Sequence, residues 1–167
     1  MNEYELVKAA KSGDKDAFCS LYGLYKDRLY RYAYYKLNNS QDAQDAVQDC
    51  VISAFEQISA LKSCKAFPSW IFTILRGVCT KYIKLQIHQR HGVDMNEASN
   101  LFNVMSDDSA VLSGALEILN PQERDIVLLS VVAGFTSKEI SRIVGLTSGS
   151  VRSKLSRSLA KMRDYLE

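Results

Sequence analysis

Glycine and proline are scarce in this sequence of 167 residues, which contains only 8 glycines and 2 prolines. Their combined frequency is about half of the usual value of roughly 12%, so the tight turns that many short strands need are few. We therefore expect an all-α chain rather than an all-β sandwich. Hydrophobic residues make up 47% and charged residues 24% of the chain, which is typical of a folded protein and excludes a disordered one.

The sequence also lacks a long apolar segment. The most apolar stretch, residues 126–135, is about ten residues long and contains a serine, whereas a membrane-spanning helix needs about 20 apolar residues. The N-terminus is acidic and has neither the basic start nor the apolar segment of a secretory signal. We expect a cytoplasmic protein that does not insert directly into a membrane.

Motifs that carry covalent chemistry are absent as well. No phosphate-binding glycine loop, nucleophile elbow or dinucleotide fingerprint occurs. The four cysteines, at positions 19, 50, 64 and 79, have no CxxC spacing and are interpreted as reduced, mostly structural thiols. His88 and His91 lie near Asp94 but have no Cys or Glu at ligand spacing, so we expect neither a metal site nor a cofactor.

Charged residues of like sign are grouped into separate segments along the sequence. Residues 41–60 carry four acids and no Lys or Arg, and residues 61–90 carry six basic residues and no acid. Residues 91–118 are again acidic only, and residues 148–163 hold five basic residues without an acid. Two basic blocks separated by an acidic one indicate two surfaces that face a polyanion, although a run of like charge is more often just a solvated face.

Apolar residues at steps of three and four predict four helices in the first part of the chain, over about 3–12, 15–37, 40–58 and 69–85. Asn2 and Asp14 are the expected N-caps of the first two. In the third helix, Asp42, Asp45 and Asp49 fall on the outer face and give it a negative side. Tyrosines at positions 22, 25, 30, 32, 34 and 35 are expected to pack their rings and keep their hydroxyls at the surface.

Residues 87–113 show no sustained period and predict a flexible acidic linker between two small helical domains, residues 1–86 and 114–167. At about 3.3 Å per residue this linker could extend about 80 Å, more than two turns of DNA at about 34 Å each. The last domain contains capping boxes at Asn120–Glu123 and Thr136–Glu139, and a turn at Gly145 before a basic helix. This order predicts a helix-turn-helix. The final helix is expected to bury one face, made of Val151, Leu155, Leu159, Met162 and Leu166.

The second helix of a helix-turn-helix enters the major groove, so its outer face needs donors for phosphates and base edges. The final helix offers Thr147, Ser148, Ser150, Arg152, Ser153, Lys154 and Arg157. In the first basic block, aromatic residues alternate with cations, a pattern that suits an unpaired strand. Trp70 and its apolar neighbours also have the spacing of a helical core, and we favour the core for most of them.

Taken in order, these motifs resemble the extracytoplasmic-function (ECF) sigma factors of bacterial RNA polymerase. Three segments resemble sigma region 2: residues 6–22, residues 42–49, which are similar to the family's DAEDLVQE signature, and residues 67–76, which are similar to its FRAWLLRIAR segment. Three further segments, residues 120–124, 134–141 and 145–155, resemble sigma region 4. The conjunction of all six in this order is more specific than any one alone.

The resemblance implies a promoter-recognition subunit that is not an enzyme, since the polymerase supplies catalysis. It implies docking on core RNA polymerase through Asp42, Asp45, Gln48 and Asp49. It implies contact with the minus-ten element of promoter DNA through Lys62, Ser63, Cys64, Lys65, Phe67, Trp70 and Arg76, and with the minus-thirty-five element through the final helix. It also implies an anti-sigma partner that is linked to the membrane and masks these surfaces, and a chain that is a monomer when free.

The sequence departs from the family pattern near the minus-ten segment. After Arg76 the family usually has Asn and, four residues later, an acid, whereas this chain has Gly77 and Lys81. The loop over residues 62–66 is this chain's own, and we expect it to set which minus-ten base is preferred.

Two other classes of function remain open from the residues alone. A helix-turn-helix regulator would use the last domain alone and the N-terminal helices for dimerisation or ligand sensing, and would bind palindromic sites as a dimer. An enzyme with a helical catalytic domain would need a substrate and motifs that the sequence does not contain.

Overall fold

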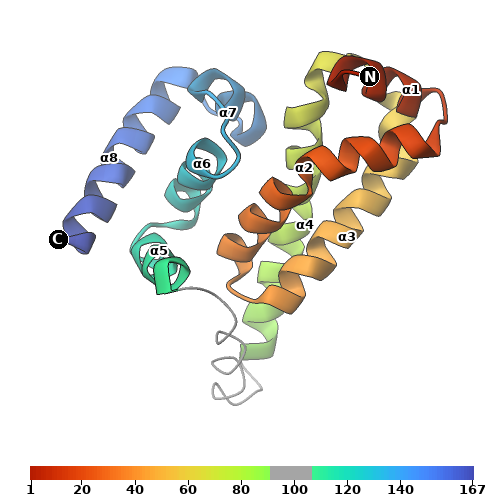
Figure 1. Ribbon diagram of the computed structural model, residues 1–167. Coiled ribbons are helices and arrows are strands. Elements are labelled where there is room, and N and C mark those ends of the chain that lie inside the picture. Colours follow the sequence, from red (N-terminus) through yellow and green to blue (C-terminus); the bar gives the residue numbers. More distant parts are fainter. Residues whose placement is uncertain (91–106) are drawn as a thin grey trace.

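The computed structural model describes residues 1–90 and 107–167, and within these ranges it contains helices and turns but no strand. In the N-terminal half, three long helices lie side by side: α2 (Lys15–Leu37), α3 (Ser40–Gln57) and α4 (Phe67–Arg90) (Figure 1). The short helix α1 (Glu3–Lys11) packs at one end of this bundle, against α2 and the two 3-10 turns that join α3 to α4. These turns are η1 (Ile58–Ala60) and η2 (Cys64–Ala66).

Side-chain caps start these helices where the sequence predicts. The Asn2 side chain accepts a hydrogen bond from the backbone N–H of Glu5 at 2.8 Å, and Asp14 accepts one from Ala17 at 3.1 Å. Between α2 and α3, Asn38 adopts the left-handed conformation with φ of 53°, which ends one helix before Asn39 caps the next. The predicted interruption between the helices over 15–37 and 40–58 is confirmed.

Aromatic residues of α2 form much of the core of this bundle. Tyr25 and Tyr32 are buried, and their rings meet Phe67 and Phe72 of α4 edge to face at 5.3 and 5.9 Å between centroids. The expectation of surface hydroxyls is wrong for Tyr32, whose hydroxyl is buried and donates to Asp125. A carboxylate partner makes that burial possible, because an unpaired buried hydroxyl would lose its bonds to water.

The C-terminal half contains α5 (Asp107–Glu117), α6 (Pro121–Val131), α7 (Ser137–Val144) and α8 (Ser148–Leu166). Both predicted capping boxes are present, at the starts of α6 and α7. Gly145 ends α7 with φ of 78°, a conformation that glycine adopts without steric cost, and the chain turns there into α8. The predicted helix-turn-helix is confirmed.

The buried face of α8 differs from the expected one. Val151 and Met162 are buried and Leu155 is partly buried, but Leu159 and Leu166 are exposed. The buried row instead includes Ser158, which is fully covered and donates to Glu123 at 3.4 Å. The buried residues of α8 follow positions 151, 155, 158 and 162, which face α6 and α7, and position 159 lies about 70° from the middle of this row on the helix surface.

Helices extend into both ends of the segment that we expected to be a linker. Helix α4 continues to Arg90 and α5 begins at Asp107, so residues 87–90 and 107–113 are helical. The middle of the predicted linker, residues 91–106, lies outside the described residues. His91 and Asp94 of the rejected metal site also lie there, while His88 is exposed on α4.

The two halves pack directly against each other, with α6 against α2 and α7 against α4. Phe135, in the turn before α7, meets Phe72 of α4 edge to face at 5.1 Å. The guanidinium of Arg28 donates to the backbone carbonyl of Ala133 at 3.2 Å. In this structure the two predicted domains therefore contact each other directly.

Candidate functional site

The acidic face of α3 lies along the boundary with α4. Asp49 is exposed and accepts a hydrogen bond from the Tyr82 hydroxyl at 2.8 Å, and Asp42 accepts one from the Gln86 side chain at 2.9 Å. Burial and the bond to Asp49 raise the pKa of Tyr82 to about 12, so this hydroxyl stays protonated and donates at neutral pH. The aspartates thus sit in fixed positions along the edge of the helix pair.

These aspartates keep an unbalanced negative charge. Within the described part of the chain, no Lys or Arg forms an ion pair with Asp42, Asp45 or Asp49. Asp45 accepts a hydrogen bond from the neutral Gln41 side chain at 3.0 Å, and Gln48 is exposed one turn further along the helix. The four residues that the sequence predicts for docking are brought together on one helix, where they offer acceptors to a basic partner.

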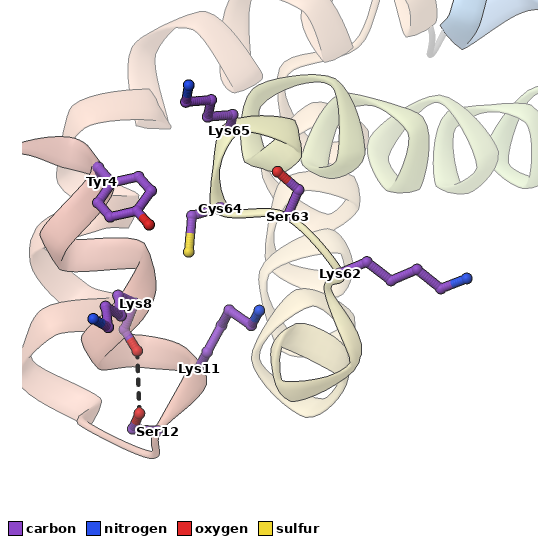
Figure 2. Close-up of a pocket in the computed structure, with 8 residues that line it drawn as sticks. All are labelled: Tyr4, Lys8, Lys11, Ser12, Lys62, Ser63, Cys64 and Lys65. Carbon is purple, nitrogen blue, oxygen red and sulfur yellow. Dashed lines mark hydrogen bonds between the residues drawn. The ribbon is translucent and has the colours of Figure 1, made fainter.

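A basic hollow separates α1 from the loop before α4. It has a volume of about 620 Å³ and is lined by Tyr4, Lys8, Lys11, Ser12, Lys62, Ser63, Cys64 and Lys65 (Figure 2). The Cys64 thiol points into the space toward α1, whereas the amine of Lys62 points away from it. The predicted loop residues 62–65 therefore meet a second element that the sequence analysis did not assign to the site.

The positive charge of this basic hollow comes from four lysines: Lys8, Lys11, Lys62 and Lys65. Among the described residues, none of the four lysines forms an ion pair. The acids of α1 bond elsewhere, because Glu5 closes the capping box and Glu3 accepts from the Tyr25 hydroxyl. Such a concentration of unpaired positive charge favours a polyanion. From the sequence, the only indication that the first helix contributes to this site is the pair Lys8 and Lys11, three residues apart, and two lysines on one helix are a weak indication.

The two aromatic residues beside the basic hollow, Phe67 and Trp70, differ in how deeply they are buried. Phe67 is buried at the start of α4, where its ring contacts Tyr25. It therefore packs in the core beneath the loop and does not face solvent, as a residue in contact with DNA would. Trp70 is partly buried, with its ring 5.9 Å from that of Phe67. Trp70 therefore retains an accessible surface one helical turn from the loop.

Arg76, the remaining minus-ten candidate, contacts the other half of the protein. Its Nε–H donates to the carboxylate of Asp125 in α6. The Tyr32 hydroxyl also donates to this carboxylate, and Lys36 Nζ lies 3.6 Å from it. Burial raises the pKa of Tyr32, an effect that the negative charge of Asp125 increases, while burial lowers the pKa of Lys36 and Asp125 opposes that shift.

Asp125 was not identified by sequence reasoning. It is 2% exposed, although aspartate is rarely buried unless it is paired. The sequence contained one indication that Asp125 is buried: it lies directly before the apolar run 126–129, on a helix that buries most of its residues. Nothing in the local pattern could show that its partners lie 49 to 93 residues earlier in the chain.

The predicted residues of the final helix gather at its N-terminal half. Thr147 is the N-cap and accepts from the backbone N–H of Ser150 at 3.1 Å. Beyond it, Arg152, Ser153, Ser156 and Arg157 line a shallow surface hollow, with both arginines exposed. This surface lies away from the row that packs on α6 and α7, so cationic and hydroxyl donors are available to a ligand.

Comparison with known protein families assigns each half of the chain to a region of the sigma-70 family. The family model for sigma-70 region 2 matches residues 21–86, and the one for sigma-70 region 4 matches residues 109–162. The chain is an ECF sigma factor of the sigma-70 family. Its region 2 match contains the acidic face of α3 and the predicted minus-ten residues, and its region 4 match contains the predicted minus-thirty-five residues.

Curated relatives agree with this assignment. The ECF RNA polymerase sigma factor BldN of Streptomyces coelicolor is 29% identical over 95% of this chain and 64% of its own length. The ECF RNA polymerase sigma factor SigW of Bacillus subtilis is 24% identical over 96% of this chain and 94% of its own length. This sigma factor therefore spans slightly less than two thirds of the first relative and nearly all of the second.

Solved structures show the same fold. CnrH, determined in complex with the cytosolic domain of CnrY, matches with a TM-score of 0.75 at 21% identity and covers 98% of this chain and 96% of its own. The sigma factor RpoE, determined with the anti-sigma factor NepR from Bartonella quintana, matches with a TM-score of 0.71 at 22% identity over 89% of this chain and 96% of its own. In the described residues of the sigma factor, no helix is long and apolar enough to cross a membrane.

Proposed function

We propose that this sigma factor binds core RNA polymerase through α3, the minus-ten element through the basic hollow and α4, and the minus-thirty-five element through α8. One observation carries the proposal: unpaired charge of opposite sign is separated on the molecule, with acids on α3 and cations at the basic hollow and on α8. Charge of one sign on each surface selects a different class of partner.

The acidic face of α3 is the proposed polymerase contact. Asp42, Asp45 and Asp49 offer carboxylate acceptors to basic side chains of a protein partner, and Gln48 adds a neutral donor and acceptor. Hydrogen bonds from α4 hold two of these carboxylates in place before binding. A surface that is already ordered loses less conformational entropy when it binds.

The basic hollow and the first turns of α4 are the proposed minus-ten site. Lys8, Lys11 and Lys65 supply positive charge for the backbone of an unpaired strand, Ser63 and Cys64 line the space between the helices, and Trp70 offers a ring for stacking. Lys62 points away from the basic hollow, so its amine is available to the backbone of a strand that continues beyond it. This arrangement adds α1 to the site that the sequence predicted.

The exposed side of α8 is the proposed minus-thirty-five site. Its N-terminal half carries Arg152 and Arg157, whose guanidinium groups can bond phosphates or the major-groove edge of guanine. Ser148, Ser150, Ser153 and Lys154 supply further donors, and Thr147 orients the start of the helix. The contacts to phosphate position the helix and those to base edges give specificity.

The remaining properties follow from the same role. The sigma factor positions the polymerase and stabilises melted DNA without covalent chemistry of its own, and it acts in the cytoplasm, where polymerase and chromosome meet. An anti-sigma factor that covers these surfaces would regulate it, in the way that the similar sigma factor RpoE forms a complex with the anti-sigma factor NepR. The alternative of a dimeric regulator is not favoured, because the N-terminal half matches sigma region 2.

The test of the proposal is run-off transcription by purified core polymerase on a library of genomic fragments, with and without the sigma factor. Transcript starts that appear only with the protein and share two spaced upstream elements are the expected result. If no such start appears while the protein binds duplex DNA as a dimer, the regulator function replaces the proposed one.

The docking part has its own control. Charge reversal at Asp45 and Asp49 to lysine is expected to weaken binding to core polymerase at least tenfold, a loss of about 1.4 kcal/mol. The matched control is Glu56→Lys, which reverses an exposed charge at the end of the same helix and leaves the affinity close to that of the wild type. Equal affinity for all three proteins would remove the docking assignment.

A further inference from the structure

Asp125 is the point at which the two halves of the chain are joined by charge. Its carboxylate belongs to α6, but the groups around it come from the N-terminal bundle: the Tyr32 hydroxyl and Lys36 from α2, and the Arg76 guanidinium from α4. The side chains of Asp125 and Lys36 are 3% and 8% exposed. A buried carboxylate between two cations and a hydroxyl is a specific lock between the halves.

This lock depends on all of its members being present. A buried ion pair contributes little net stability, but removal of one partner leaves an uncompensated buried charge and is strongly destabilising. Without Asp125, Lys36 and Arg76, which both belong to the N-terminal half, would lie beside each other at the interface with no anion to compensate them. The halves would then separate so that the buried Lys36 regains water.

Arg76 belongs to this lock and to the proposed minus-ten site. We propose that Asp125 holds the free sigma factor in a closed state in which Arg76 and the adjoining face of α4 are withheld from DNA, and that DNA phosphate replaces Asp125 as the partner of Arg76 when the halves separate. The identification of DNA phosphate as the partner that replaces Asp125 rests on the proposed function. The closed state itself rests on the contacts of Asp125.

The reach of the molecule requires such a separation. Elements named minus ten and minus thirty-five are 25 base pairs apart, which is about 85 Å of duplex at about 3.4 Å per base pair. A compact chain of this length has a radius of gyration of about 15 Å and therefore a diameter near 40 Å. The closed molecule cannot place α4 and α8 on both elements, so binding to both breaks the contacts between the halves.

Among the described residues, the other contacts between the halves include no ion pair. One is the bond from Arg28 to the Ala133 carbonyl, which water can replace when the halves part. Another is the edge-to-face contact of Phe72 with Phe135. Asp125 differs from these because its loss changes the net charge of the interface, so a single substitution tests it.

The experiment measures the size of the full-length protein by small-angle X-ray scattering. Asp125→Asn keeps the shape of the side chain and removes its charge, and we expect its radius of gyration to rise well above the value of about 15 Å expected for the closed wild type. Tyr32→Phe, which removes one donor and leaves the proposed DNA surface intact, is expected to give a smaller increase. An unchanged radius of gyration for Asp125→Asn, with helix content preserved by circular dichroism, would overturn the proposal.

Glu123→Gln is the matched control. Glu123 is a carboxylate of the same helix, but its partners Lys161 and Ser158 belong to the C-terminal half. Its neutral replacement can still accept the bond that completes the capping box. We expect the radius of gyration of this variant to equal that of the wild type, and an equal expansion in both variants would also overturn the proposal.

The replacement of Asp125 by phosphate is tested with a labelled pool of random 20-nucleotide single-stranded DNA, by fluorescence anisotropy. Asp125→Asn is expected to bind about fivefold more tightly than the wild type, since a larger fraction of molecules is competent to bind. The double variant Asp125→Asn/Arg76→Ala is expected to lose that gain. A gain that survives the loss of Arg76 would overturn the exchange of partners.

These results separate the closed state from the proposed function. If Asp125→Asn expands the protein but neither it nor the wild type supports run-off transcription, the closed state stands and the proposed function fails. If both proteins support transcription but have the same radius of gyration, the proposed function stands and the closed state fails.

Discussion

At the scale of single residues, burial divides the four cysteines into two classes. Cys50 and Cys79 are fully buried, and burial raises the pKa of each thiol to about 12. Cys19 is exposed and Cys64 is partly exposed at the basic hollow. Since the thiolate is the reactive form, the buried pair is protected both by its protonation and by its position.

We predict that a thiol reagent such as DTNB titrates two cysteines quickly in the folded protein and the other two only after denaturation. Cys19→Ser and Cys64→Ser are each expected to remove one fast equivalent, while Cys50→Ser leaves the fast count at two. Rapid reaction of all four thiols without denaturant would contradict the burial of Cys50 and Cys79.

The protonation of Glu123 makes the stability of the folded protein depend on pH. The hydrogen bond from Lys161, at 2.9 Å, and those from Asn120 and Ser158 lower the pKa of this carboxyl below its ordinary value of 4.5. The folded protein therefore releases this proton more readily than the unfolded chain. The stabilisation is fully present above pH 4.5 and is lost as the pH falls through the lower folded-state pKa.

We predict that Glu123→Gln is less stable than the wild type at pH 7 and that the difference shrinks below pH 4.5. The measurement is the free energy of unfolding in urea from pH 3 to pH 7. Asp164→Asn, which changes an exposed carboxyl on α8, is the control. A difference between Glu123→Gln and the wild type that stays constant over this range would contradict the assigned shift.

At the scale of secondary-structure elements, local caps explain why the helix boundaries could be predicted. In α7 the Thr136 side chain accepts from the backbone N–H of Glu139 at 3.2 Å, and the Glu139 side chain accepts from the backbone N–H of Thr136 at 3.0 Å. All participants lie within four residues, so the pattern is legible in the sequence. Because α7 has only eight residues, its capping box satisfies a large share of its free backbone donors.

We predict that Thr136→Ala lowers the free energy of unfolding by about 1 kcal/mol, the usual cost of losing an N-cap side chain. Thr73→Ala is the matched control, since its hydroxyl bonds a backbone carbonyl one turn back within α4 and caps nothing. That variant is expected to change stability by less than about 0.5 kcal/mol. Equal losses in the two variants, measured by urea denaturation, would argue against the cap.

At the scale of the whole molecule, the halves share one interface that no local pattern describes. Phe72 and Phe135 belong to sigma region 2 and sigma region 4, and their rings meet across this interface. Aromatic pairs of this geometry contribute about 0.5–1.5 kcal/mol beyond the area that they bury. Such coupling makes the unfolding of one half depend on the other.

We predict a coupling energy of about 1 kcal/mol between Phe72→Leu and Phe135→Leu in a double-mutant cycle on the free energy of unfolding. The control cycle pairs Phe72→Leu with Met162→Leu, a buried residue of α8, and is expected to give less than about 0.5 kcal/mol. If the two cycles agree, the halves do not stabilise each other through this contact.

The helices, their caps and the helix-turn-helix could be predicted from the sequence, because each depends on residues that are close in the chain. The site could be predicted only in part. Lys62 and Lys65 were found through their charge and Ser63 and Cys64 through the family resemblance, but Lys8 and Lys11 join them only when α1 packs beside η2. The exposed Leu159 was assigned to the core because apolar periodicity cannot show that α8 rests on two helices at once.

By itself the sequence determined that this protein is helical, that it carries separated blocks of charge and that it resembles an ECF sigma factor. The tertiary structure alone decided which of those charges remain available. Arg76 is paired and the lysines of the basic hollow are not, because Asp125 is brought to α4 by the packing of α6 and α7. Electrostatic partners are chosen by distance in space, and distance in space between remote residues is set by the fold.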